Sequence, residues 1–180
     1  MLQITIPENH LWDESKEEFI DTKEQTIQLE HSLISISKWE SKWHVPFFNN
    51  KGMTEEQTLD YIKCMTITQN VKPETYLGLT QDNINKIREY IDDPMTATTI
   101  KEPPGSPKSN KIITNEVIYS WMISFGIPPE YRKWHINRLM TLIKVCSAEN
   151  QPNKKMGRND TIKQYADLNA QRRKMLNTRG

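Results

Sequence analysis

Hydrophobic and polar residues alternate in two short segments near the amino terminus. Residues 2–6 (LQITI) and 26–31 (TIQLEH) place an aliphatic side chain at every second position, which is the pattern of a half-buried β-strand. The segment EEFID (17–21) lies between them. The pattern therefore predicts a small antiparallel β-sheet within about residues 1–31.

From about residue 32 the spacing of apolar residues changes to three and four, which is typical of amphipathic helices. Thr54 followed by Gln57 forms a capping-box sequence, Thr80 and Thr114 stand where helices begin, and Pro94 stands where one ends. We predict a helical domain of about residues 32–150. Its helices are expected near residues 34–43, 54–67, 80–93, 114–126 and 130–146.

The last two of these helices are expected to form an αα-hairpin, because Gly126 and the pair Pro128–Pro129 separate them. The first of the two is apolar almost all round and is predicted to lie at the centre of the fold. Its predicted core stripe is Ile118, Trp121, Met122 and Phe125.

Two segments lack apolar periodicity. Residues 99–111 contain three Pro, one Gly and two Ser and are predicted to be a mobile connector. A second break at 150–159 separates the domain, residues 1–150, from a basic carboxyl-terminal tail, residues 151–180. Asp160 is the expected cap of a last helix, on which Ile162, Tyr165 and Leu168 form a weak stripe. The fold class is mainly α (α+β), with a small N-terminal sheet and a basic C-terminal helix.

The formal net charge of +1 conceals a gradient along the chain. Residues 1–100 carry 9 Lys and Arg and 17 Asp and Glu, a net −8, whereas residues 101–152 carry +3 and residues 153–180 carry +6. An acidic domain with a basic tail suits contact with nucleic acid, with an acidic protein or with the domain itself. A simply solvated tail is the alternative.

No motif in the sequence indicates an enzyme. Glycine patterns that hold phosphates are absent, and Cys64 and Cys146 do not form the spacing of a zinc site. His135 falls on the buried stripe of its predicted helix with Leu139 and Leu142, so we interpret it as a hydrogen-bonded core histidine. We expect no catalytic residue, cofactor or metal. Because no apolar run reaches membrane-spanning length, we also expect no membrane partner.

Aromatic residues offer two interpretations each. Trp134 is expected on the polar side of its helix, with Arg138 one turn later. The guanidinium either covers the indole ring, or both side chains anchor a partner. A cluster of four other aromatic residues is expected to be core rather than a binding surface. Its members are Trp39, Trp43, Phe47 and Phe48.

Four stretches together resemble the tail assembly chaperones of long-tailed, siphovirus-type bacteriophages. They are LEHSLISISKWESKW (29–43), MTEEQTLDYIKCMTIT (53–68), ITNEVIYSWMISFGIPPEYRKWHINRLMTLIKVC (113–146) and LNAQRRKMLNTRG (168–180). Their order and spacing cover most of the chain, and none of them is a catalytic motif.

The resemblance implies a non-enzymatic protein of the host bacterial cytoplasm that binds the tape measure protein and keeps it soluble while the tail tube assembles. It also implies a frameshifted longer form of the chain and self-oligomers as partners. A structural virion component, such as a tail or connector subunit, is the alternative. A nucleic-acid-binding regulator that uses residues 153–180 is a third hypothesis.

The family likeness assigns no contact residues, so the candidates come from the helical pattern and the charge. Partner contacts, or core positions, are expected at Trp121, Phe125, Trp134, Arg138, Leu139 and Met140. Electrostatic contacts of the tail are expected at Lys154, Lys155, Arg158, Arg172, Arg173 and Lys174.

Overall fold

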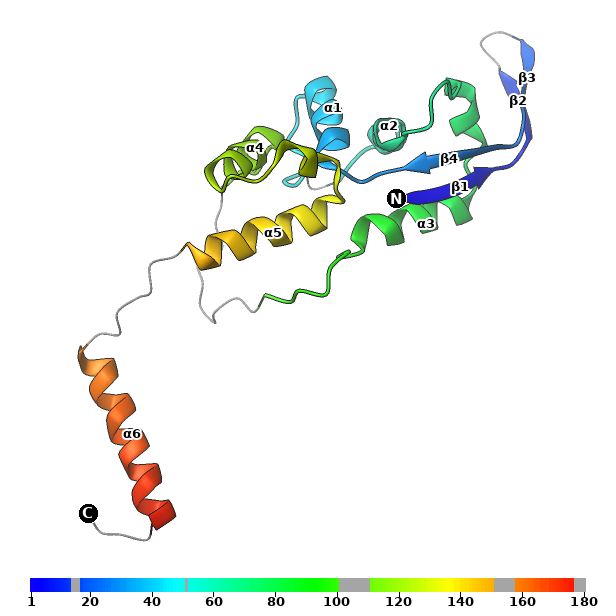
Figure 1. Cartoon of the computed structure of the whole chain (residues 1–180). Coiled ribbons are helices and arrows are strands. Elements are labelled where there is room, and N and C mark those ends of the chain that lie inside the picture. The colour runs from blue at the N-terminus through cyan, green and yellow to red at the C-terminus, as the bar shows by residue number, and fades with distance from the viewer. Residues whose placement is uncertain (14–16, 51, 101–110, 151–157, 177–180) are drawn as a thin grey trace. The chain divides into compact units, whose positions relative to one another are not determined.

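The computed structural model describes residues 1–13, 17–50, 52–100, 111–150 and 158–176 (Figure 1). The chain divides into two compact units, Met1–Cys146 and Ser147–Gly180, here called the body and the tail unit. The described part is mainly helical with a small antiparallel β-structure at the amino terminus, which confirms the predicted fold class. Most of the predicted connector, residues 101–110, lies outside the described residues.

The amino-terminal β-structure consists of two strand pairs rather than one sheet. Strand β1 (Leu2–Ile6) pairs antiparallel with β4 (Gln25–Leu29), and β2 (Asn9–Asp13) pairs with β3 (Glu18–Thr22). In the first pair the aliphatic residues face the core, whereas Gln3, Thr5, Thr26 and Gln28 face outward, as their alternation predicts. The first pair packs against α3 (Gln81–Asp92) and the 3₁₀ turn η1 (Pro73–Gly78), and β3 of the second pair also contacts η1.

Local capping sequences begin the first three helices. Helix α1 (Leu33–Trp43) starts with a capping box formed by Ser32 and Ser35, and α2 (Glu55–Met65) starts with the predicted box of Thr54 and Gln57. Helix α3 (Gln81–Asp92) starts at Thr80, whose side chain accepts a hydrogen bond from the backbone of Asn83, and ends before Pro94. A 3₁₀ turn, η1 (Pro73–Gly78), precedes α3.

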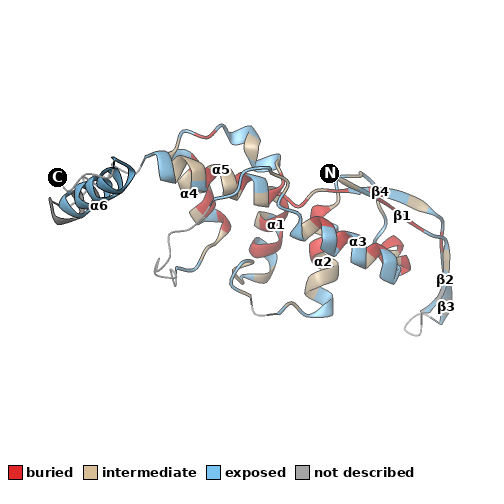
Figure 2. Cartoon of the chain, turned by 90° about the horizontal axis from the view of Figure 1, so that it is seen from below, coloured by how far each residue is buried: buried red, intermediate tan, exposed pale blue. Residues whose placement is uncertain are grey.

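Helix α1, not the predicted helix 114–126, is the central one. Leu33, Ile36 and Trp39 of α1 are completely buried, and α1 packs against α2, against α4 (Asn115–Ser124) and against the 3₁₀ turn η2 (Pro129–Lys133). On α4, by contrast, Ile123 is 81% exposed. An apolar helix on the outside of a fold leaves apolar side chains exposed to solvent, where a partner is able to cover them. The exposed positions of α4 are pale blue in Figure 2.

The prediction of one continuous helix over residues 130–146 is wrong. Residues 129–133 form the 3₁₀ turn η2, Trp134 is extended, and α5 (Ile136–Glu149) begins only after His135. The reason is non-local. His135 forms an isolated antiparallel β-bridge with Ser32, and the backbone N–H of Ile136 donates to the carbonyl oxygen of His31 over 2.7 Å. This pairing holds the chain extended where the apolar spacing alone favours a helix.

Gly126 ends α4 as predicted, in a left-handed conformation with φ of 64°. The N–H of Ile127 donates to the carbonyl oxygen of Met122, and that of Gly126 donates to Ile123, which together form a Schellman motif. Because Ile127 is buried, the motif also directs the chain back to the core.

We expect Gly126→Ala to lower the free energy of unfolding by about 1 kcal/mol, because an L-residue is strained at this φ. No atom lies within 4 Å of the added Cβ, so steric overlap does not contribute. Urea titration of the full chain measures the change. Gly52→Ala, also in open space but without the positive φ, is the control; equal effects of the two substitutions would contradict the backbone explanation.

The tail unit contains helix α6 (Arg158–Leu176). This helix begins two residues before Asp160, so Asp160 lies in the first turn and is not the cap that the sequence suggested. Every α6 side chain whose burial is described is exposed, including Ile162, Tyr165 and Leu168 of the predicted stripe.

Candidate partner-binding surface

His135 is a buried, fully hydrogen-bonded residue, as predicted. Its Nε2 lies 2.9 Å from the carbonyl oxygen of Tyr90, and its Nδ1 accepts from the backbone N–H of Asn137 over 3.3 Å. Since a carbonyl only accepts, Nε2 carries the proton and the ring is neutral. Burial lowers the pKa of His135 below its usual value. Both ring nitrogens of His135 are therefore engaged in hydrogen bonds with the backbone.

His31 lies next to His135 at the junction of β4, α1, α2 and α5. The two imidazole centroids are 5.0 Å apart, and Nδ1 of His31 is hydrogen-bonded with the hydroxyl of Tyr61. Burial, and then the neighbouring His135, lower the pKa of His31 to about 3, and burial raises the pKa of Tyr61. At neutral pH the three groups are uncharged, so the junction joins four elements without a buried charge on these rings.

Within the described ranges, no group of three or more His, Cys, Asp or Glu side chains is placed to hold a metal ion. Cys64 and Cys146 are not joined in a disulfide bond, and both are half-buried. Burial raises the pKa of the Cys64 thiol, which disfavours the reactive thiolate.

Trp134 and Arg138 are in contact with one another. The guanidinium carbon of Arg138 lies 4.0 Å from the centroid of the Trp134 ring, and the ring of Tyr131 stacks on Trp134 with centroids 4.0 Å apart and planes at 14°. The indole is thus held between a cation and a phenol and stays half-exposed. The predicted covering of the Trp134 ring by the Arg138 guanidinium is confirmed. Part of the indole remains exposed to solvent.

The other predicted partner residues divide between core and surface. Leu139 is completely buried and belongs to the core. Trp121, Phe125 and Met140 are half-buried against that core, and the ammonium group of Lys111 lies 5.5 Å from the Trp121 ring centroid. These three are the members of the predicted set that offer apolar surface from α4 and α5.

The body also contains a groove that the sequence did not indicate. It has a volume of about 370 Å³ and is formed by α1, the end of α2 and η2. Ile34 and Lys38 line it from α1, Cys64 and then Ile67 from α2 and the segment after it, and Lys133 from η2. We call it the α1–α2 groove. Ile67 is the one lining residue whose place in the sequence could have suggested the groove. It is an aliphatic residue that lies beyond the end of α2, and its side chain is exposed.

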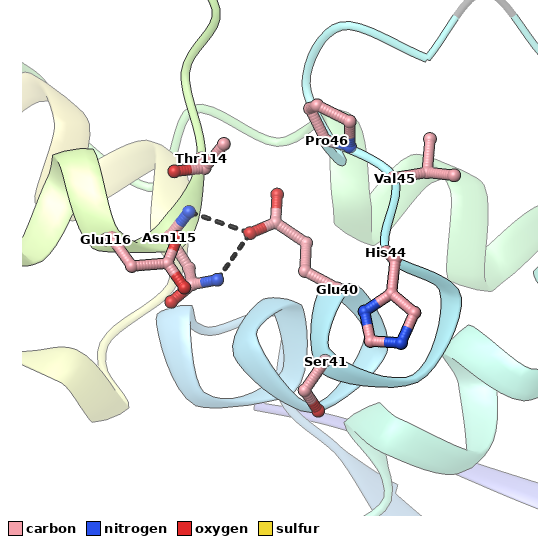
Figure 3. A pocket seen from close by; sticks show the side chains of 8 residues that line it. All are labelled: Glu40, Ser41, His44, Val45, Pro46, Thr114, Asn115 and Glu116. Carbon is pink, nitrogen blue, oxygen red and sulfur yellow. Dashed lines mark hydrogen bonds between the residues drawn. The ribbon is translucent and has the colours of Figure 1, made fainter.

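A second hollow, of about 270 Å³, lies between α1 and the start of α4 (Figure 3). The buried carboxylate of Glu40 lines it and caps the amino terminus of α4 in place of the predicted Thr114, whose side chain makes no capping hydrogen bond. One oxygen of Glu40 accepts from the backbone and side-chain amides of Asn115 over 2.8 and 2.6 Å, and the other accepts from the backbone of Phe47 over 2.7 Å. Both carboxylate oxygens of Glu40 are therefore engaged in hydrogen bonds within the body.

The aromatic cluster near α1 belongs to the core only in part: Trp39 is core, Trp43 and Phe47 are half-buried against it, and Phe48 is exposed. Trp39 is completely buried and donates from Nε1 to the carbonyl oxygen of Gln57, and Phe47 packs against it with ring centroids 5.5 Å apart. Trp43 is half-buried and donates to Asp60, and Phe48 is the exposed member.

The basic residues predicted for tail contacts are partly placed. Arg172, Arg173 and Lys174 are exposed near the end of α6. Arg158 is the first residue of α6, and Lys154 and Lys155 lie outside the described residues.

Comparisons with known proteins give no match: no family, no curated protein and no solved structure is similar to this chain. Among the helices that the structure describes, none is both long and apolar enough to cross a membrane.

Proposed function

We propose that this chain is a non-enzymatic tail assembly chaperone that binds the tape measure protein of a long-tailed bacteriophage and keeps it soluble during assembly of the tail tube. The resemblance of four stretches of the sequence motivates the proposal. The observations that carry it are the apolar surface on α4 and α5, with the exposed Ile123 and the Trp134 stack, and the α1–α2 groove.

The physical requirement of such a chaperone matches this surface. A long helical client with unpaired apolar stripes aggregates unless the stripes are covered. Grooves and aromatic side chains between helices receive an amphipathic helix through contacts one turn apart. Half-buried side chains such as Trp121 and Met140 add modest area each, which permits release when the tube replaces the chaperone.

Co-expression tests the proposal. The full chain, tagged, is expressed with the tape measure protein of its own phage, and we expect the client to stay soluble and to co-purify. Ile123→Glu is expected to reduce co-purification several-fold, because it places a charge in the apolar surface of α4. Leu77→Glu, at a 50% exposed position on η1, is the matched control. Absence of association at low salt would overturn the proposal.

Mass spectrometry of purified particles separates the chaperone from the alternative of a structural tail or connector subunit. A chaperone leaves before the particle is complete, so its peptides are expected to be absent from finished virions. Stoichiometric recovery from the particles would favour the structural component instead.

A further inference from the structure

We propose that the α1–α2 groove binds an acidic amphipathic helix, with Lys38 and Lys133 pairing with carboxylates that flank an aliphatic side chain seated on Ile34 and Ile67. The inference rests on the proposed function and specifies the chemistry of the client segment. It also assigns the docking to a part of the body that lies outside the residues predicted from the sequence.

The charges of the groove carry the argument. Lys38 and Lys133 are both exposed, and neither is in an ion pair with any residue that the structure describes. Other lysines of the body are engaged, Lys42 of α1 with Asp60 and Lys86 of α3 with Asp82. Two unpaired cations at one groove favour an anionic partner and oppose a cationic one.

The acidic residue in the groove wall does not cancel these cations. Glu30 is largely buried, accepts a hydrogen bond from the Tyr90 hydroxyl over 2.6 Å, and pairs with the amino group of Met1 at 3.2 Å. Its carboxylate is thus already compensated by the Tyr90 hydroxyl and by the amino terminus. The uncompensated charge of the lining is positive.

The floor of the groove is apolar and held in place by backbone hydrogen bonds. The side chain of Ile67 is 50% exposed, and those of Ile34 and Cys64 are half-buried. The N–H of Glu30 donates to Met65 over 2.9 Å and that of Ile67 to Gln28 over 2.8 Å, so the segment after α2 pairs with β4. A partner therefore meets a preorganised surface, and the groove loses little conformational entropy on binding.

The size of the groove selects a few side chains rather than a whole domain. Its volume of about 370 Å³ stands at the lower end of the roughly 300–1,000 Å³ typical of ligand sites. One turn of a helix inserts one aliphatic side chain and places residues three or four positions away over the rims. Glu or Asp at those positions would reach Lys38 and Lys133.

Two designed 20-residue peptides test the inference with the full chain. Both are amphipathic helices with the same leucine stripe, and they differ only in having Glu or Lys beside it. By fluorescence anisotropy in low salt, we expect the Glu peptide to bind about tenfold more tightly than the Lys peptide. The double variant Lys38→Glu/Lys133→Glu is expected to reverse this preference.

Two further variants control for charge and folding. Lys23→Glu/Lys72→Glu makes the same change in net charge at exposed positions away from the groove and is expected to keep the wild-type preference. Lys38→Gln/Lys133→Gln removes the cations without adding charge and should abolish the preference, while circular dichroism verifies the fold.

Failure of this inference is distinguishable from failure of the proposed function. Equal binding of the two peptides, no binding of either, or a preference unchanged in Lys38→Glu/Lys133→Glu overturns the groove proposal. If that variant still keeps the tape measure protein soluble, the chaperone function stands without the groove. If the wild type prefers the Glu peptide but does not associate with the tape measure protein, the client has been misassigned.

Discussion

Lowering the pH from 7.5 to 5 is expected to destabilise the body by about 2 kcal/mol through His31 alone. In the fold, burial lowers the pKa of His31 to about 3, whereas an unfolded histidine titrates near 6.5. Between these two values the unfolded chain binds a proton that the folded chain does not. The stabilisation is therefore complete above about pH 6.5 and is lost as the pH falls toward 3, at about 1.4 kcal/mol per pH unit.

Urea titrations of the full chain between pH 7.5 and 5 measure this slope, and His135 adds to it in the same direction because its pKa is also lowered. His31→Gln should flatten the slope, whatever its effect at pH 7.5. His10→Gln is the control, since Asp21 raises the pKa of the exposed His10 and its contribution has the opposite sign. An unchanged slope in His31→Gln would rule out His31 as the acid-sensitive group.

Replacing Glu40 by Ala is expected to lower the free energy of unfolding by about 3 kcal/mol. The substitution leaves the backbone N–H groups of Asn115 and Phe47 and the Asn115 side-chain amide without their acceptor. A buried donor without an acceptor costs about 1–3 kcal/mol. The loss falls on the start of α4, which Glu40 joins to α1 across 75 positions of sequence.

Glu40→Gln should be milder, because its amide oxygen still accepts from one side while its NH₂ group faces a donor on the other. Glu89→Ala, at an exposed position on α3, is the charge-matched control and is expected to change stability by less than about 0.5 kcal/mol. Thermal and urea unfolding of the three variants provide the comparison. If Glu40→Ala and Glu89→Ala were equally stable, the capping role of Glu40 would be wrong.

Sequence reasoning succeeded where the information is local. Thr54 with Gln57 and Thr80 act on donors within one turn of their own helix, and the alternation in residues 2–6 faces one side to the core. Gly126 likewise acts within its own turn. These positions needed no knowledge of the rest of the fold.

The errors occurred where distant segments decide. Glu40 sits within α1 with no cue that it caps α4, so Thr114 appeared to be the cap. The apolar spacing of 130–146 is helical, but pairing of His135 with Ser32 overrides it. The same override placed Trp134 in an extended segment, although its contact with Arg138 was anticipated from the two residue types.

The candidate surface was predictable only in part. Trp121, Phe125 and Met140 were identified from the helical pattern as partner contacts or core positions, and all three are half-buried against the core. The α1–α2 groove was missed because Lys38, Ile67 and Lys133 come from three separate elements, and each alone resembles ordinary solvent-facing sequence.

The backbone hydrogen bond between His31 and Ile136 forms only late during synthesis of the chain. These partners are 105 positions apart, and a bacterial ribosome adds about 5–20 residues per second. The segment that follows β4 and contains His31 therefore waits roughly 5–20 s after its synthesis before Ile136 exists. During this interval the backbone groups of the segment after β4 have no partner from α5 and are exposed to other chains.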